Sequence, residues 1–159
     1  MMAGGLRHDA IVWPPARVGC YAAAMVEEIS VRTTGQGLHE VTPAIQRVVT
    51  DAGCADGLCT VLIRHTSASL TIQENADPSA RHDLERWMER MVPEGQAWFT
   101  HTSEGPDDMP SHIRAALTST TLSIPVLGGR LALGTWQGIY VWEHRRRGSA
   151  RRLVVHVGP

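Results

Sequence analysis

The stretch TLSIPVLGGRLALGTWQGIYVWEHRRRG, residues 121–148, decides the fold because it carries the densest strand signals of the chain. Its first half holds two apolar runs joined at Gly128 and Gly129, a glycine pair typical of a tight β-hairpin turn. Its second half, residues 134–148, predicts one long strand, and RRLVVHVG at residues 151–158 predicts another. Strands gathered at one end of the chain, without a regular alternation of strand and helix, favour an antiparallel or mixed sheet.

Shorter strands are predicted in the rest of the chain. They are expected at residues 25–34, 58–65, 69–74 and 97–101. The segment LCTVLIRH at residues 58–65 is mostly apolar, which predicts a strand buried on both faces.

Three helices are predicted, at residues 42–53, 77–93 and 109–117. Thr42, Asp77 and Asp108 are well placed to cap them, and a proline follows each cap within the first turn. The second helix has the clearest apolar stripe, formed by Ala80, Leu84, Trp87, Met88 and Met91.

Together these elements predict an α+β fold, a compact single domain at residues 25–159 with a large mixed or antiparallel β-sheet and about three helices. Residues 1–24 lack the apolar core of a signal peptide, because Pro14 and Pro15 interrupt AIVW. We expect this leader to be disordered or to precede a true start at Met25.

The composition is that of a globular domain with no general affinity for nucleic acid or membranes. The 159 residues are 43% hydrophobic and 19% charged, with a formal net charge of −1. All fifteen basic residues are arginine, which excludes a Schiff-base lysine and the lysine of a phosphate-binding P-loop. Any phosphate held by a side chain is therefore held by arginine or histidine, although the lack of lysine can equally reflect genome composition.

The cysteines do not form a recognisable framework. Cys20, Cys54 and Cys59 are odd in number and lack C-x-x-C spacing, which is typical of a protein of the reducing cytoplasm. The chain has no apolar run long enough to span a membrane.

The segment HTSEGPDDMPSH, residues 101–112, is the first candidate site. Two histidines bracket two adjacent acids, and two prolines restrict the chain between them. One interpretation is structural: Asp107 and Asp108 stabilise a helix N-terminus, and both histidines lie on the surface. The other is a divalent metal site with His101 and His112 as ligands, which needs a third protein ligand.

His144 is the natural candidate for the third ligand, at the end of the long predicted strand. The alternative is a histidine that leaves the sheet beside a solvated arginine run. That run, HRRRGSARR, is either a solvated hairpin tip or a site for phosphate or pyrophosphate. Nucleic-acid binding is a third possibility, disfavoured by the neutral total charge.

The segment RHTSASLTIQEN, residues 64–75, is the second candidate site. His65 is followed by small hydroxyl residues, but the chain has no G-x-S-x-G motif, and a histidine so close in sequence rarely faces the serine as its base. We therefore expect a polar pocket rather than a serine hydrolase.

The segments HTSASLTIQENAD, DDMPSH and above all IPVLGGRLALGTWQGIYVWEHR resemble the YjbQ family, described as secondary thiamine-phosphate synthase enzymes. The resemblance extends from about residue 25 onward. It implies a homotrimer with a histidine-lined site near the subunit boundaries that takes a metal ion or an oxyanion. It also implies a reaction that joins a pyrimidine methyl diphosphate to a thiazole phosphate and releases pyrophosphate, either as the main activity or as a side activity.

Matching positions provide the expected site residues. The metal group is expected to be His101, His112 and His144, with zinc as the expected ion and magnesium as the alternative for the transferase reaction. The expected catalytic residues are His65, Glu74, Asp107 and Asp108. Contacts to the substrate or its anion are expected from Asn75, Thr135, Gln137 and Arg145, with a further contact from His65. Two alternatives stay open, a metal-dependent hydrolase of a small phosphorylated or acyl substrate and a non-catalytic binding protein for an anionic metabolite.

Overall fold

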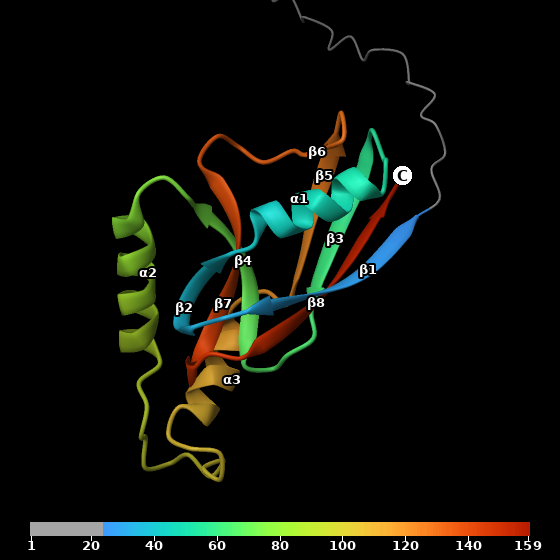
Figure 1. Cartoon of the computed structure of the whole chain (residues 1–159). Coiled ribbons are helices and arrows are strands. Elements are labelled where there is room, and N and C mark those ends of the chain that lie inside the picture. The colour runs from blue at the N-terminus through green and yellow to red at the C-terminus, as the bar shows by residue number, and fades with distance from the viewer. Residues whose placement is uncertain (1–23) are drawn as a thin grey trace, which may run out of the picture.

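The computed structural model describes residues 24–159, so the predictions for the leader at residues 1–24 lie almost wholly outside the described residues. Eight strands and three helices follow one another in this part of the chain (Figure 1). The strands are β1 (Met25–Arg32), β2 (Gly35–Glu40), β3 (Gly57–Ile63), β4 (Ala68–Glu74), β5 (Thr121–Leu127), β6 (Arg130–Leu131), β7 (Gln137–Arg147) and β8 (Ala150–Gly158). The helices are α1 (Thr42–Asp51), α2 (Pro78–Met91) and α3 (Asp108–Leu117).

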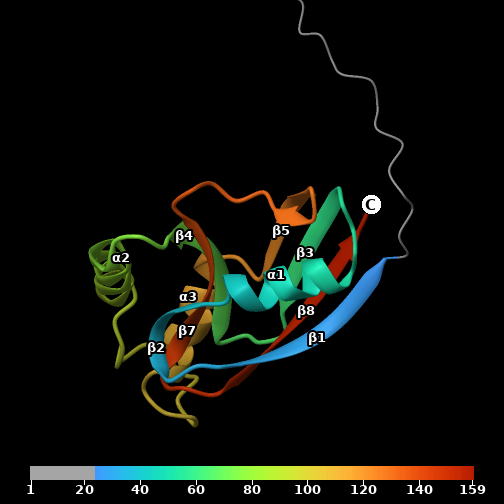
Figure 2. The ribbon, with the colours of Figure 1, turned by 45° about the horizontal axis from the view of Figure 1, so that its top comes forward.

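The strands form two antiparallel sheets, which confirms the α+β class with antiparallel pairing. One has five strands in the order β1-β8-β3-β5-β6, and the other has three in the order β2-β7-β4. The β5–β6 hairpin turns at Gly128 and Gly129, whose φ angles of 57° and 76° are those of the predicted turn. The five-stranded sheet curves past α1 (Figure 2). Strand β1 forms one edge of this sheet, and β8 lies next to it.

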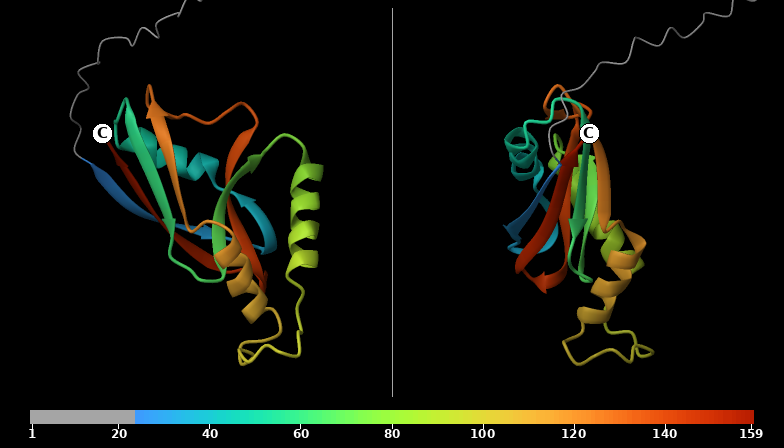
Figure 3. Two further views of the ribbon diagram at one scale, coloured as in Figure 1. Left: turned by 180° about the vertical axis from the view of Figure 1, so that it is seen from behind. Right: turned by 90° about the vertical axis from the view of Figure 1, so that its right-hand side faces the viewer.

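Strand β7 is central because both of its faces are buried. Ile139 and Val141 join the main core with α1, β3 and β8. Tyr140 and Trp142 point to the other side and pack against α2 and α3. Helices α1 and α3 therefore cover opposite faces of β7, and α3 lies at the end of the molecule reached by the loop after α2 (Figure 3).

Several local predictions are confirmed. Helix α2 begins as expected, with the carboxylate of Asp77 accepting from the backbone N–H of Ser79 at 2.8 Å. Of its predicted apolar stripe, Met88 is fully buried, whereas Trp87 and Met91 are about half exposed. Cys54 and Cys59 are free thiols, and Cys20 lies outside the described residues.

Other local predictions are wrong. Residues 97–101 form turns instead of a strand, because no neighbouring strand offers them a ladder and Phe99 N–H donates back to Gln96. The strand at 58–65 is buried on one face only, since Leu58 and Leu62 face outward. Thr42 is the first residue of α1 and not its cap, because its hydroxyl instead accepts from the backbone N–H of Ile139.

Candidate metal centre and anion cavity

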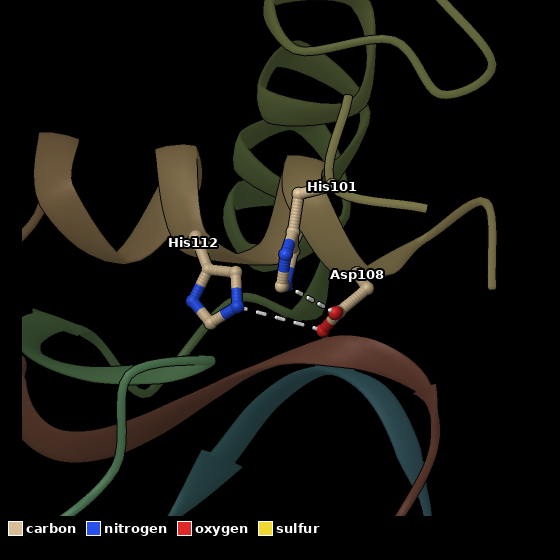
Figure 4. A group of neighbouring side chains, drawn as sticks. All are labelled: His101, Asp108 and His112. Atoms are coloured by element: carbon tan, nitrogen blue, oxygen red, sulfur yellow. Dashed lines mark ion pairs between the residues drawn. The ribbon is translucent and has the colours of Figure 1, made fainter. Parts of the chain in front are cut away.

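Three side chains meet where the loop before α3 returns to the three-stranded sheet (Figure 4). His101 comes from that loop, and Asp108 and His112 lie one turn apart on the same face of α3. His101 Nε2 lies 2.8 Å from Asp108 Oδ2, and His112 Nε2 lies 3.6 Å from Asp108 Oδ1. Counting one donor atom from each residue, all three lie within 4.8 Å of one another.

The orientation of the His112 ring leaves a lone pair for this cluster. Its Nδ1 lies 3.0 Å from the carbonyl oxygen of Thr66, and a carbonyl can only accept. Nδ1 therefore carries a hydrogen, and Nε2 is the ring nitrogen that faces Asp108 and is placed to bind a metal ion. A carbonyl that fixes the tautomer through the far ring nitrogen is the usual support of a metal-ligating histidine.

The Asp108 carboxylate is the buried member of the cluster, 2% exposed. Its Oδ1 pairs with Arg145. Its Oδ2 lies 2.8 Å from His101 Nε2, but no well-aligned hydrogen bond reaches it among residues 24–159. A buried carboxylate beside two imidazole nitrogens fits a cation: two nitrogens and one oxygen with a further open position are typical of catalytic zinc sites.

Asp107 and Arg145 hold Asp108 in place. Asp107 is the N-cap residue of α3 but makes no side-chain cap bond. Its Oδ2 instead accepts from Arg145 Nε and from the backbone N–H of Arg146, both at 3.0 Å. Burial alone would raise the pKa of Asp107, but these bonds and the Arg145 charge lower it below its ordinary value. The prediction that Asp108 caps this helix is therefore wrong, because Asp108 lies inside the first turn and both carboxylates face Arg145.

Two cavities adjoin the cluster. The first has a volume of about 660 Å³ and is lined by Ser67, Asp107 and four arginines, Arg145, Arg146, Arg147 and Arg151. The second, of about 460 Å³, is lined by His101 together with Phe99, Pro106 and Met109. One is rich in cationic groups and the other is more apolar, so the site can accept a charged group on one side and a ring on the other.

His144 does not join this cluster of donors. It is fully buried, with Nε2 2.9 Å from Ser69 Oγ, and burial, followed by the charge of Arg114, lowers its pKa to about 3. The group that can hold a metal consists of His101, Asp108 and His112 among the described residues, so Asp108 takes the place predicted for His144. The alternative of a solvated histidine is wrong, because β7 is still covered on both faces at this position.

The comparisons with known proteins agree with this architecture. The family described as UPF0047 protein YjbQ-like has a model that matches residues 27–158. The chain belongs to the YjbQ-like family. It is 52% identical to a UPF0047 protein of Synechocystis over 82% of this chain and 89% of that protein, and 44% identical to the UPF0047 protein YjbQ of Escherichia coli O157:H7 over 79% and 91%.

Solved structures of the YjbQ-like family have the same fold. A crystal structure of a yjbq/upf0047 family protein from Clostridium acetobutylicum covers 82% of this chain and 98% of its own, with a TM-score of 0.75 and 31% identity. A YbjQ-like protein of unknown function from Sulfolobus solfataricus has a TM-score of 0.77 at 23% identity, which shows the fold alone.

The remaining YjbQ-like motif residues divide into two places. His65 lies near Arg151, beside the first cavity. Glu74, Asn75, Thr135 and Gln137 lie at the other end of the β4–β7 ladder, where Glu74 pairs with Gln137. That end is six ladder positions from the Ala68–Glu143 pair, about 20 Å at the usual rise per residue. A single YjbQ-like chain therefore does not bring this second group to the metal cluster.

The sequence analysis did not predict two groups that support the site. One is the carbonyl of Thr66, which no sequence signal could reveal because every residue carries the same group. The other is the ion pair between Glu143 and Arg151, buried at 0% and 6% side-chain exposure. Its members lie in the motif EHR and in the arginine run, but only the turn from β7 to β8 brings them together. Gly148 permits that turn, since a Cβ there would lie 2.2 Å from the carbonyl oxygen of Thr33.

Proposed function

We propose that this chain is a metal-dependent enzyme acting on a phosphorylated substrate, with His101, Asp108 and His112 holding a divalent cation. The observation that supports this most is the cluster itself, in which the buried carboxylate of Asp108 lies beside the imidazoles of His101 and His112. Two imidazole donors favour zinc, whereas magnesium prefers oxygen ligands.

The specific reaction that we propose is the one implied by the YjbQ resemblance: a pyrimidine methyl diphosphate is joined to a thiazole phosphate, and pyrophosphate leaves. Negative charge builds on the leaving oxygens, and a divalent cation, when bound, neutralises such charge. Arg145 and Asp107 position the Asp108 carboxylate. The arginine-lined cavity supports binding of the diphosphate, and the cavity of Phe99 and Met109 suits a heteroaromatic ring.

The first test is metal content. We expect about one zinc per chain in untagged protein, lost in His101→Ala and His112→Ala and retained in His82→Ala, which removes an exposed histidine of α2. Circular dichroism of each variant shows whether it is folded. A folded wild type that cannot be loaded with zinc or magnesium would contradict the metal centre.

The second test is pyrophosphate release from the zinc-loaded protein. Release that requires both the pyrimidine diphosphate and the thiazole phosphate would support the proposed transfer. Release from the diphosphate alone would support the hydrolase alternative. Binding without turnover would support a non-catalytic binding protein.

We propose further that the protein is a homotrimer of the cytoplasm. Val26, Leu58 and Leu62 are between 42% and 65% exposed on the outer side of the five-stranded sheet, which supports self-association. A stable monomer at micromolar concentration by light scattering would contradict the trimer. No helix among residues 24–159 is long and apolar enough to cross a membrane.

A further inference from the structure

The arginine-lined cavity has one wall that the metal centre does not use. Arg145 is paired with Asp107 and Asp108, and Arg146 with Glu94. Arg147 is exposed and has no acidic partner among residues 24–159. Arg151 and Ser67 also line this cavity.

Arg151 is 5% exposed, yet one of its nitrogens is not used by its ion pair. Nε and Nη2 donate to the two oxygens of Glu143. Nη1 points the other way, 3.2 Å from Ser67 Oγ and 3.3 Å from His65 Nδ1. Glu143 thus fixes the guanidinium so that its remaining N–H groups face the wall of the cavity.

The contact between Arg151 and His65 cannot be a hydrogen bond as it stands. The backbone N–H of Arg152 donates to His65 Nε2 at 2.9 Å, so Nε2 must be the unprotonated nitrogen. Nδ1 then carries the hydrogen, and two donors face each other across 3.3 Å. Burial, followed by the charges of Arg151 and Arg152, lowers the pKa of His65, so its neutral form dominates at pH 7. These donors are therefore available to an oxygen acceptor of a ligand.

We propose that Arg151 Nη1, Ser67 Oγ and His65 Nδ1 form an oxyanion subsite that takes a phosphate group of the substrate. Ser67 accepts from Arg151, so its own hydrogen is free to donate. Arg147, on the same cavity, adds an unpaired positive charge. Convergent N–H and O–H donors around a buried guanidinium are the usual environment of a bound phosphate.

The subsite adjoins the metal centre through two pairs of consecutive residues. Thr66 supports the ring of His112, and Ser67 lines the cavity. Asp108 belongs to the metal cluster, and Asp107 lines the cavity. We infer that one phosphate group of the substrate binds at the metal cluster and the other at Arg151. This assignment of the substrate's second anion rests on the proposed function, whereas the subsite itself does not need the metal.

The test is a calorimetric titration of the full-length protein with inorganic phosphate. Metal is first removed with a chelator. We expect Ser67→Ala to weaken phosphate binding about 10-fold, the effect of losing one hydrogen bond to a charged group. Arg147→Gln is expected to weaken it about threefold, as for loss of an exposed charge. The matched controls are Ser123→Ala on β5 and Arg130→Gln on β6, both exposed and outside the cavity, which should bind like wild type.

Arg151→Gln would leave the charge of Glu143 buried and unpaired, and the protein could fail to fold. Arg151→Lys keeps a positive charge for Glu143 but removes the second donor, so it should fold and bind phosphate about 10-fold more weakly. Phosphate binding that is absent in wild type, or unchanged in both Ser67→Ala and Arg151→Lys, overturns the subsite.

Zinc content of the same variants separates the two proposals. Phosphate binding lost in Ser67→Ala while zinc is retained supports the subsite and leaves the metal centre intact. Phosphate binding in a protein that takes up no zinc keeps the subsite and refutes the metal centre. Zinc uptake without any phosphate binding refutes the subsite alone.

Discussion

The two ends of the β4–β7 ladder differ in what surrounds their polar residues. At the Ala68–Glu143 end, charged groups are buried and linked: Glu143 pairs with Arg151, and Arg145 pairs with Asp107 and Asp108. At the Glu74–Gln137 end, the polar side chains are exposed and bond locally, as when Gln137 accepts from the backbone N–H of Gly134 at 2.8 Å. Residues of the same sequence motifs therefore lie in two different environments. Those at the Ala68–Glu143 end are buried in ion pairs, and those at the Glu74–Gln137 end are exposed.

The largest expected effect is on stability at the buried end. Glu143→Gln leaves the Arg151 guanidinium without its counter-charge, and we expect a loss of about 3–5 kcal/mol in the free energy of unfolding. Urea denaturation measures it. The control is Glu28→Gln, which removes the exposed pair with Arg64 and should cost less than about 1 kcal/mol. If Glu143→Gln and Glu28→Gln lowered the free energy of unfolding equally, burial would not distinguish the Glu143–Arg151 pair from the exposed Glu28–Arg64 pair.

The next effect is on the metal. Asp108→Asn removes the only carboxylate of the cluster and should weaken zinc binding at least about 100-fold, or about 2.7 kcal/mol. Competition with a chromophoric chelator measures the affinity. Asp83→Asn, an exposed change on α2, is the matched control. Unchanged affinity in a folded Asp108→Asn protein would exclude this carboxylate as a ligand.

A smaller effect concerns pH. The folded protein keeps His144 neutral, with a pKa near 3, whereas the unfolded chain protonates it below about 6.5. The unfolded state thus binds more protons, so this contribution to stability is complete above pH 6.5 and is lost as pH falls toward 3. Between pH 7 and pH 5 we expect wild type to lose about 2 kcal/mol from this group.

His144→Gln should flatten the pH dependence, since it keeps a polar contact to Ser69 but cannot titrate. Urea titrations at both pH values measure the difference. A His144→Gln protein with the same slope as wild type would show that this residue does not remain neutral in the folded state.

The smallest effect is expected at the exposed end. Glu74→Gln and Gln137→Ala should leave zinc affinity within about twofold of wild type, because distant sites without shared partners act independently. Zinc and phosphate titrations of both variants provide the measurement. Retained binding with lost turnover would show that a neighbouring subunit brings this end of the ladder to the site, and would sharpen the comparison.

Local signals predicted the elements whose stability is local. The cap of α2 needs only Asp77 and the two residues after it, and the turn at Gly128–Gly129 needs only glycines that tolerate positive φ. The strand predicted at residues 97–101 failed because a strand requires a partner, which its apolar side chains cannot provide. Thr42 and Asp108 looked like caps, but their oxygens found partners on β7 instead.

The sequence by itself determined the α+β class, the antiparallel hairpin, the family and two members of the candidate metal cluster, His101 and His112. Each of these depends on residue types at fixed spacing along the chain. Only the tertiary structure brought Asp108, and not His144, beside the two histidines, paired Arg145 with both aspartates and directed Arg151 toward Ser67. Those choices depend on which buried charges become neighbours, and a charge removed from water must take the partner that the packing of β7, β8 and α3 places beside it.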